Sequence, residues 1–380
     1  MLILLLFSAC GTQSFFTQNS VTLTEDVITI PIDNSLKIPI TNVEINGKIY
    51  RFIIDTGAPT VISTRIYEEL QLKPATKRHV SDSQNQAQKQ IFTLIPEMHV
   101  AGAKFHNVGC VVIDFLDYVF QCREIDGIIG ANQMAPAYWK FDYSQNKIEV
   151  AKELYMFDMQ DFDYRISFAE MPQKTPKIDL EIFGKTRLLT FDTGYTGSIQ
   201  ISDTPKEIQG FGEDKLVKSF GAKNLGIFGA GNASVNYAFK TGQLKIGNLP
   251  VGDEIIDTGN SNLLGNDFLK DYIFIIDWQQ KLIYLKKIKE SPVSLETFGF
   301  GYRFIENRAQ VIVVYEIDIP VEIGDIILEI NEQSFENLSD ADVCELTINK
   351  PEAGKKQIEI KIDRNGEILE LQLDKVKLLD

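Results

Sequence analysis

The tripeptide Asp-Thr-Gly occurs three times in the chain, and two of the copies, Asp55–Gly57 and Asp192–Gly194, stand far apart in similar sequence surroundings. Ordinary residue usage would place it in a chain of 380 residues only about 0.1 times. The aspartate supplies a carboxylate, the threonine a hydroxyl that can bond to a facing loop, and the glycine a tight turn that brings an N–H near the carboxylate. Two such loops facing each other would hold two carboxylates around one water molecule.

Two carboxylates that close cannot both ionise readily, so the pair shares one proton. The ionised member can act as general base on the water, while the protonated member polarises a carbonyl; the roles reverse when the leaving group takes up a proton. The chemistry expected of Asp55 and Asp192 is therefore hydrolysis. Because the pair titrates as a unit, the sequence does not identify which aspartate is the base.

An internal repeat contains both triplets. The segment Pro39–Gly57 matches Pro176–Gly194 at a constant offset of 137 residues, with Pro, Glu, Ile, Gly, Lys and Asp-Thr-Gly in common. Each copy predicts a strand, a tight turn at Gly47 or Gly184, a second strand and then the triplet. The constant offset predicts equivalent positions for the two aspartates.

The repeat continues downstream, where Ile128-Ile-Gly130 matches Leu263-Leu-Gly265. A third triplet, Asp257–Gly259, stands only six residues before Leu263. That spacing leaves no room for the rest of a repeat, and the downstream register aligns Asp257 with Cys122. The third triplet is therefore not expected to be catalytic.

Strand-like alternation bounded by Gly, Asn, Asp or Pro dominates the chain, which predicts a mostly β fold. Helical periodicity is confined to short segments such as 64–70 and 339–347. The expected organisation is a signal and tether over 1–22, two copies of one fold over 23–157 and 158–290, and a small third domain over 291–380.

The two triplets and their downstream glycines resemble the aspartic peptidases of the pepsin and retropepsin clan. The resemblance covers residues 23–290 and is closest to bacterial retropepsin-like proteins that carry both lobes in one chain. It implies a two-lobed β-barrel peptidase fold and an aspartic endopeptidase that cleaves polypeptides with no cofactor and no metal. In this family Asp55 and Asp192 would be catalytic. The residues expected to support them are Thr56, Gly57, Gly130, Thr193, Gly194 and Gly265.

Several residues depart from the family pattern. Ala58 and Tyr195 follow the triplets where pepsin-like enzymes usually have a Ser or Thr that favours the ionised carboxylate, so raised carboxyl pKa values and a weakly acidic to neutral optimum are expected. The chain after Asp192 is also roughly two residues longer than the chain after Asp55. Lys77–Thr93 and the Gly-rich segment 220–232 are either flaps over the site or plain loops.

The C-terminal segment resembles a PDZ domain. Phe298, Gly299, Phe300 and Gly301 stand where that family has its carboxylate-binding loop, and residues 323–331 match its most recognisable strand. The resemblance implies a small α+β domain that binds a peptide by strand addition. The other interpretation is a structural appendage packed on the rest of the protein.

A net charge of −15 and a pI of about 4.8 argue against a nucleic-acid partner. The apolar start that ends at Cys10 resembles a bacterial lipoprotein signal peptide, with Cys10 lipidated. That motif predicts a protein of the bacterial cell envelope, held at the membrane only by an N-terminal lipid anchor. Cys110 and Cys122 either pair with each other or remain separate buried thiols.

Two other functions are compatible with these features. A non-catalytic exported scaffold could keep the fold and recognise peptides through the PDZ-like domain. A β-rich carbohydrate-binding lipoprotein has support only from composition.

Overall fold

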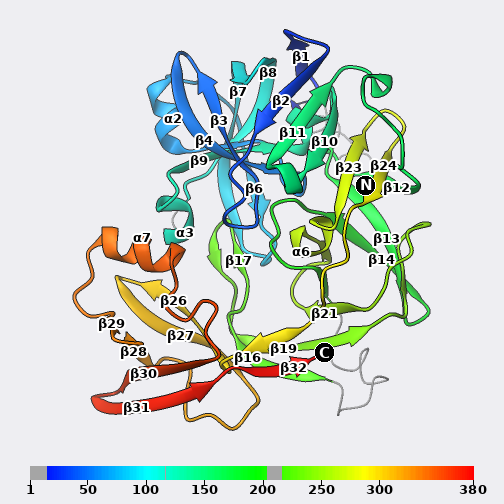
Figure 1. Cartoon of the computed structure of the whole chain (residues 1–380). Coiled ribbons are helices and arrows are strands. Elements are labelled where there is room, and N and C mark those ends of the chain that lie inside the picture. Colours follow the sequence, from blue (N-terminus) through cyan, green and yellow to red (C-terminus); the bar gives the residue numbers. More distant parts are fainter. Residues whose placement is uncertain (1–14, 116, 203–215) are drawn as a thin grey trace, which may run out of the picture.

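β-Strands make up most of the protein, as the sequence predicts (Figure 1). The structure is a computed structural model that describes residues 15–115, 117–202 and 216–380. Its helices are short: α2 (Thr64–Glu69), α3 (Tyr118–Gln121), α4 (Ala131–Met134), α6 (Asn266–Leu269) and α7 (Asp340–Ile348). No helix among the described residues is long and apolar enough to cross a membrane.

Six strands between residues 40 and 130 close into a barrel. They are β3 (Ile40–Ile45), β4 (Lys48–Asp55), β5 (Val61–Ile62), β7 (Ala87–Val100), β8 (Ala103–Val112) and β9 (Ile125–Gly130). Pairing runs β8–β5–β9–β4–β3–β7 and returns from β7 to β8. The pairs β4–β9 and β5–β8 are parallel, and the rest of the ring is antiparallel.

The same pairings recur between residues 176 and 264. The strands are β13 (Pro176–Ile182), β14 (Lys185–Phe191), β15 (Ile199–Ile201), β19 (Ser234–Thr241), β20 (Leu244–Lys245), β21 (Glu254–Thr258) and β22 (Leu263–Leu264). The parallel pairs are now β14–β22 and β15–β21, and β19 and β20 together take the place of β7. The sequence repeat is thus also a repeat in strand topology; we call the two copies the first and second repeat.

The hairpins that lead into the triplets turn at the expected glycines. Asn46 and Gly47 both have positive φ (52° and 76°), and Phe183 and Gly184 do the same (55° and 69°). Two positive values in a two-residue loop match the right-handed twist of the flanking strands. The turn fixes the register and with it the position of the aspartate that follows.

A second sheet joins the two repeats. Its order is β2–β11–β10–β23–β24–β12, and the repeats meet where β10 pairs with β23. Within this pair Phe141 lies opposite Phe274, and their rings stack with centroids 4.6 Å apart. The strands are β2 (Val27–Pro31), β10 (Tyr138–Asp142), β11 (Lys147–Ala151), β12 (Tyr164–Glu170), β23 (Tyr272–Asp277) and β24 (Leu282–Lys287).

The last residues form a small α+β unit (Figure 1). The unit has its own apolar core. Its strands are β25 (Leu295–Thr297), β26 (Phe300–Ile305), β27 (Arg308–Tyr315), β28 (Ile326–Ile330), β29 (Gln333–Ser334), β30 (Gln357–Arg364), β31 (Glu367–Asp374) and β32 (Val376–Leu379). Helix α7 begins at a capping box, in which Ser339 and Asp342 satisfy each other's backbone N–H groups. We call residues 291–380 the C-terminal unit.

Two connections attach the C-terminal unit to the repeats. Strand β27 pairs with β16 (Val217–Gly221) of the second repeat. A disulfide joins Cys122, directly after α3 of the first repeat, to Cys344 in α7. The possible Cys110–Cys122 pairing is therefore wrong, and the alternative of two separate buried thiols holds only for Cys110, which is buried and free. Sequence spacing could not reveal a partner 222 residues away.

Candidate active site

Asp55 and Asp192 meet in one cleft of about 470 Å³. Asp55 ends β4 and Asp192 follows β14, so equivalent strand ends deliver the two side chains. A side-chain hydrogen bond links their carboxyl groups. Each carboxyl also accepts a backbone N–H from its own triplet, from Gly57 at 2.6 Å and from Gly194 at 2.9 Å. The arrangement is the facing pair that the triplets predict.

Each glycine of the triplets lies against the carboxyl group of the opposite loop. A Cβ atom on Gly57 would stand 2.6 Å from Cγ of Asp192, and one on Gly194 would stand 2.4 Å from Oδ2 of Asp55. Both separations are shorter than any contact that a real side chain makes. Glycine is therefore required because any larger residue would push the two aspartates apart.

The threonines of the triplets hold the two loops together. The Thr56 N–H donates to Oγ1 of Thr193 at 3.0 Å, and the Thr193 N–H donates to Oγ1 of Thr56 at 3.1 Å. Each hydroxyl then donates across the interface to a carbonyl before the other aspartate, Thr56 to Phe191 and Thr193 to Ile54. Both threonines are fully buried. These four bonds fix the position of one repeat relative to the other.

Gly130 and Gly265 support the loops that follow the triplets. A Cβ atom on Gly130 would stand 2.1 Å from the backbone of Pro59, and one on Gly265 would stand 2.5 Å from the carbonyl of Gly197. The residue after each glycine also donates its N–H to the loop, Ala131 to Ala58 and Asn266 to Tyr195. The two positions are equivalent in the structure, as their spacing in the sequence predicts.

Both carboxyl groups bind protons more tightly than an exposed aspartate does. Burial raises the pKa of Asp55, against the backbone N–H groups of Gly57 and Ala58, which lower it. Burial and then the charge of Asp55 raise the pKa of Asp192 well above its ordinary value. The direction agrees with the expectation drawn from Ala58 and Tyr195, although burial is the larger cause.

The third triplet lies away from the pair. Asp257 is in β21, where its carboxylate accepts from Nζ of Lys223 at 2.5 Å. The parallel pairing places Gln200 beside Asp257 just as it places Val61 beside Val111. Asp257 is thus equivalent to Val111, and the alignment with Cys122 was wrong. The cause is that the first repeat has twelve residues between β8 and β9, whereas the second has four between β21 and β22.

A hairpin of the first repeat covers the cleft. Strand β6 (Pro74–Ser81) pairs with β7, and the tip over residues 82–86 lies on the second repeat. The contacts are Phe228 N–H to Asp82 (3.2 Å), Ser261 hydroxyl to the Ser83 carbonyl (2.7 Å), Asn260 amide to Gln84 (3.1 Å) and Gln86 amide to the Ala230 carbonyl (2.5 Å). The predicted hairpin is therefore present, and the segment 220–232 forms part of the surface that it meets, together with Asn260 and Ser261. We call this closed contact the roof.

The two sides of the cleft differ in chemistry. The first repeat contributes mostly apolar side chains. The second contributes a mixture, with the polar Gln200, Lys223 and Asn224 beside the apolar Leu225, Ile227 and Leu263. The apolar side chains include Ile38, Ile53, Ile113, Phe115, Val119, Phe120 and Ile128. A ligand side chain that enters beside the first repeat would therefore be held by hydrophobic contact.

The sequence did not reveal the bonds beneath Asp192. The Asn266 side-chain amide donates to the carbonyls of Thr193 and Lys37, and its oxygen accepts from the buried hydroxyl of Tyr143 at 2.9 Å. The equivalent residue of the first repeat is Ala131, which cannot make such bonds. In the sequence, only this difference between the two copies hinted at the hydrogen bonds that Asn266 makes.

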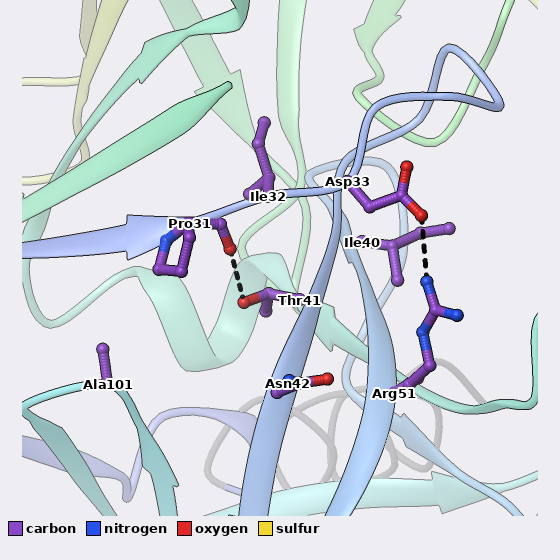
Figure 2. Close-up of a pocket in the computed structure, with 8 residues that line it drawn as sticks. All are labelled: Pro31, Ile32, Asp33, Ile40, Thr41, Asn42, Arg51 and Ala101. Carbon is purple, nitrogen blue, oxygen red and sulfur yellow. Dashed lines mark hydrogen bonds and ion pairs between the residues drawn. The ribbon is translucent and has the colours of Figure 1, made fainter. Parts of the chain in front are cut away.

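A second hollow, of about 510 Å³, lies between β2, β3 and β4 (Figure 2). Its charged side chains, Asp33 and Arg51, form an ion pair at 3.0 Å. Thr41 donates its hydroxyl to the Pro31 carbonyl at 2.9 Å. Because these groups already satisfy one another, the cleft with the paired carboxyl groups is the better candidate site.

The remaining predicted residues lie elsewhere. Phe298 is buried in the core of the C-terminal unit, and Gly299 has a φ of 92° with its carbonyl accepting from Tyr315. Phe300 and Gly301 begin β26. Cys10, the expected lipidation site, lies outside the described residues.

A family model described as aspartyl protease matches residues 41–133. The matched segment contains the whole closed barrel and the first triplet, and it ends before the second repeat. No curated protein matches the chain. The match therefore supports a general aspartic protease function, on the evidence of the first repeat alone.

Proposed function

We propose that this chain is a two-lobed aspartic endopeptidase with Asp55 and Asp192 as its catalytic pair. The observation that carries the proposal is the pair of carboxyl groups, linked by a hydrogen bond and fixed by two equivalent loops in a cleft under a hairpin. The matched family model covers only Asp55 of this pair. The assignment of Asp192 rests on the repeat and on the geometry.

The reaction follows from one proton shared by two carboxyl groups. An extended polypeptide lies between the pair and the roof, with a water molecule held by both carboxyl groups. The ionised carboxyl takes a proton from the water, which attacks the peptide carbonyl, while the protonated carboxyl donates to the carbonyl oxygen. Proton transfer to the amine then releases both products. The fixed loops supply the alignment that this exchange requires.

Further parts of the proposal concern the ends of the chain. The C-terminal unit is PDZ-like, with Phe298–Gly301 as the loop before its peptide-binding strand. Cys10 carries a lipid that anchors the protein at the bacterial cell envelope. Both ideas rest on the sequence patterns, and incorporation of a labelled fatty acid into wild type but not into Cys10→Ser would test the anchor.

Asp55→Asn and Asp192→Asn test the catalytic pair. Each change removes one ionisable group with little change in shape, so cleavage of a mixed peptide library should fall about 10²- to 10⁴-fold. Asp179→Asn is the matched control, because this substitution makes the same chemical change at an exposed position of β13. Undiminished cleavage by both active-site variants would refute the assignment. A wild type that binds peptides without cleaving them would favour the scaffold function.

A further inference from the structure

One wall of the cleft is built from a segment that the second repeat lacks. Residues 113–124 connect β8 to β9, whereas only residues 259–262 connect β21 to β22. Within the longer connection, Phe115, Val119 and Phe120 line the cleft. The rings of Phe115 and Phe120 pack edge to face with centroids 5.7 Å apart. The apolar side of the cleft therefore depends on an insertion.

The same insertion touches the C-terminal unit at two elements. Asp117 lies 3.8 Å from Arg303 of β26, and Tyr118 donates its hydroxyl to Asn307 just beyond that strand. Cys122 is bonded to Cys344 in α7, and α3 lies against α7. We call residues 117–122 the wall segment. It spans from β26 to α7 while its other side chains face the cleft.

These contacts cover one end of the surface between β26 and α7. Strand β26 pairs through one edge with β27, and no other described strand pairs with it. Tyr118 packs on the apolar core of the unit, and the side chains of Asp117 and Arg303 are only 17% and 21% exposed. A peptide added along the open edge of β26 would meet the wall segment at this end.

The C-terminal unit is also fixed to the opposite side of the cleft. Val313 and Tyr315 of β27 pair with Gly221 and Ser219 of β16, and Glu316 forms an ion pair with Lys218 at 2.8 Å. Strand β16 leads directly to Lys223 and Asn224 in the cleft. The unit is therefore anchored to both repeats, next to cleft-lining residues in each case.

From these contacts we propose that the C-terminal unit determines substrate specificity by holding the wall segment in place. The unit binds this internal segment between β26 and α7, and so positions Val119 and Phe120 as the apolar wall for a large apolar side chain of the substrate. The proposal rests on the proposed peptidase function for its substrate, but not for its structural part. Val119 and Phe120 are specificity-determining, and Cys122, Cys344, Asp117 and Arg303 are positioning residues.

The test compares the full-length wild type with Cys122→Ser/Cys344→Ser on two matched peptides, one with Phe and one with Ala at the residue beside the wall. Release of the wall segment should raise KM for the Phe peptide about tenfold and leave kcat nearly unchanged. A tenfold effect is at the lower end of the discrimination that one contact in an apolar pocket provides. The Ala peptide should be cleaved as before. Asp117→Asn/Arg303→Gln should shift the same ratio in the same direction without touching a cysteine.

Cys110→Ala is the control for loss of a cysteine, because Cys110 lies outside the bridge. A purely stabilising bridge would lower cleavage of both peptides equally, and an unchanged Phe-to-Ala ratio in both double variants would overturn the proposal. Hydrogen exchange gives a readout that needs no activity. Residues 117–122 should lose protection in the bridge variant, and unchanged exchange would also overturn the proposal. Absence of cleavage by wild type would instead count against the peptidase function.

Discussion

At the scale of single residues, the two aspartates of the pair have the same tripeptide but different surroundings. Burial raises the pKa of both carboxyl groups, and the charge of Asp55 also raises the pKa of Asp192. Lys177 opposes this shift, with its ammonium group held by the Thr190 hydroxyl at 2.5 Å. The tripeptides alone predict a pair of carboxyl groups, and the neighbouring residues give the two carboxyl groups different surroundings.

The raised pKa values predict where activity lies on the pH scale. Catalysis needs one proton on the pair, so raising both pKa values moves the acidic and the basic limb of the profile upward. We expect a maximum of kcat/KM at weakly acidic to neutral pH. A maximum below about pH 3, in the range set by the pepsin pair, would contradict this.

Glu254 predicts a pH-dependent stability. Burial raises its pKa to about 7 from 4.5, against the hydroxyl of Ser198. The folded protein therefore binds a proton that the unfolded chain releases, so stability falls as pH rises from about 4.5 to 7. At about 1.4 kcal/mol per pKa unit, the loss above pH 7 is on the order of 3 kcal/mol.

Glu254→Gln should remove this dependence and raise the free energy of unfolding at pH 8 while changing it little at pH 4. Urea denaturation of both proteins at the two pH values would measure the difference. Equal stability of variant and wild type at pH 8 would show that Glu254 is not the group responsible.

At the scale of the elements, the threonine bonds make the two triplet loops a single structure. Thr56→Val removes a hydroxyl that both donates to Phe191 and accepts from Thr193 N–H. It leaves buried backbone groups without partners, which costs about 1–3 kcal/mol for each. We expect lower stability and a lower kcat, and the Thr56→Ser variant should restore most of both. Chemical denaturation and steady-state kinetics would measure this, and an undiminished kcat in Thr56→Val would contradict it.

Elements formed by local residues were predictable from the sequence. The hairpin turns at Gly47 and Gly184, the roof hairpin near residues 77–93 and the short helices α2 and α7 follow from turn residues, alternation and caps. The wall segment was not predictable in this way, because no local sequence pattern distinguishes α3 from a loop. Its position is set by contacts with residues more than 180 positions later in the chain.

At the scale of the whole molecule, the three parts form one connected structure. The threonine bonds and the β10–β23 pair join the two repeats, and β16–β27 and the disulfide join the C-terminal unit to both. The repeat could be read from the sequence because equivalent residues recur at a fixed offset. The attachment of the C-terminal unit could not, because β27 and the two cysteines lie outside the repeat pattern, and β16, which is the counterpart of β6, gives no local sign of a second partner.

The disulfide predicts a large contribution to the stability of the whole protein. A bridge across 222 residues restricts the unfolded chain strongly, so Cys122→Ser/Cys344→Ser should lower the free energy of unfolding by about 2–5 kcal/mol. Differential scanning calorimetry would show a lower melting temperature, with Cys110→Ala as the comparison. A melting temperature equal to that of the wild type would mean that the bridge adds nothing beyond the β16–β27 pairing.

The span of this bridge also sets an order of assembly. Residue 344 is synthesised long after residue 122, and disulfides in general form and persist mainly in oxidising environments. The first barrel can close from its own residues, but its cleft wall is locked only after the last unit has folded against it. A nascent or truncated chain would therefore contain the first carboxyl group without a finished cleft.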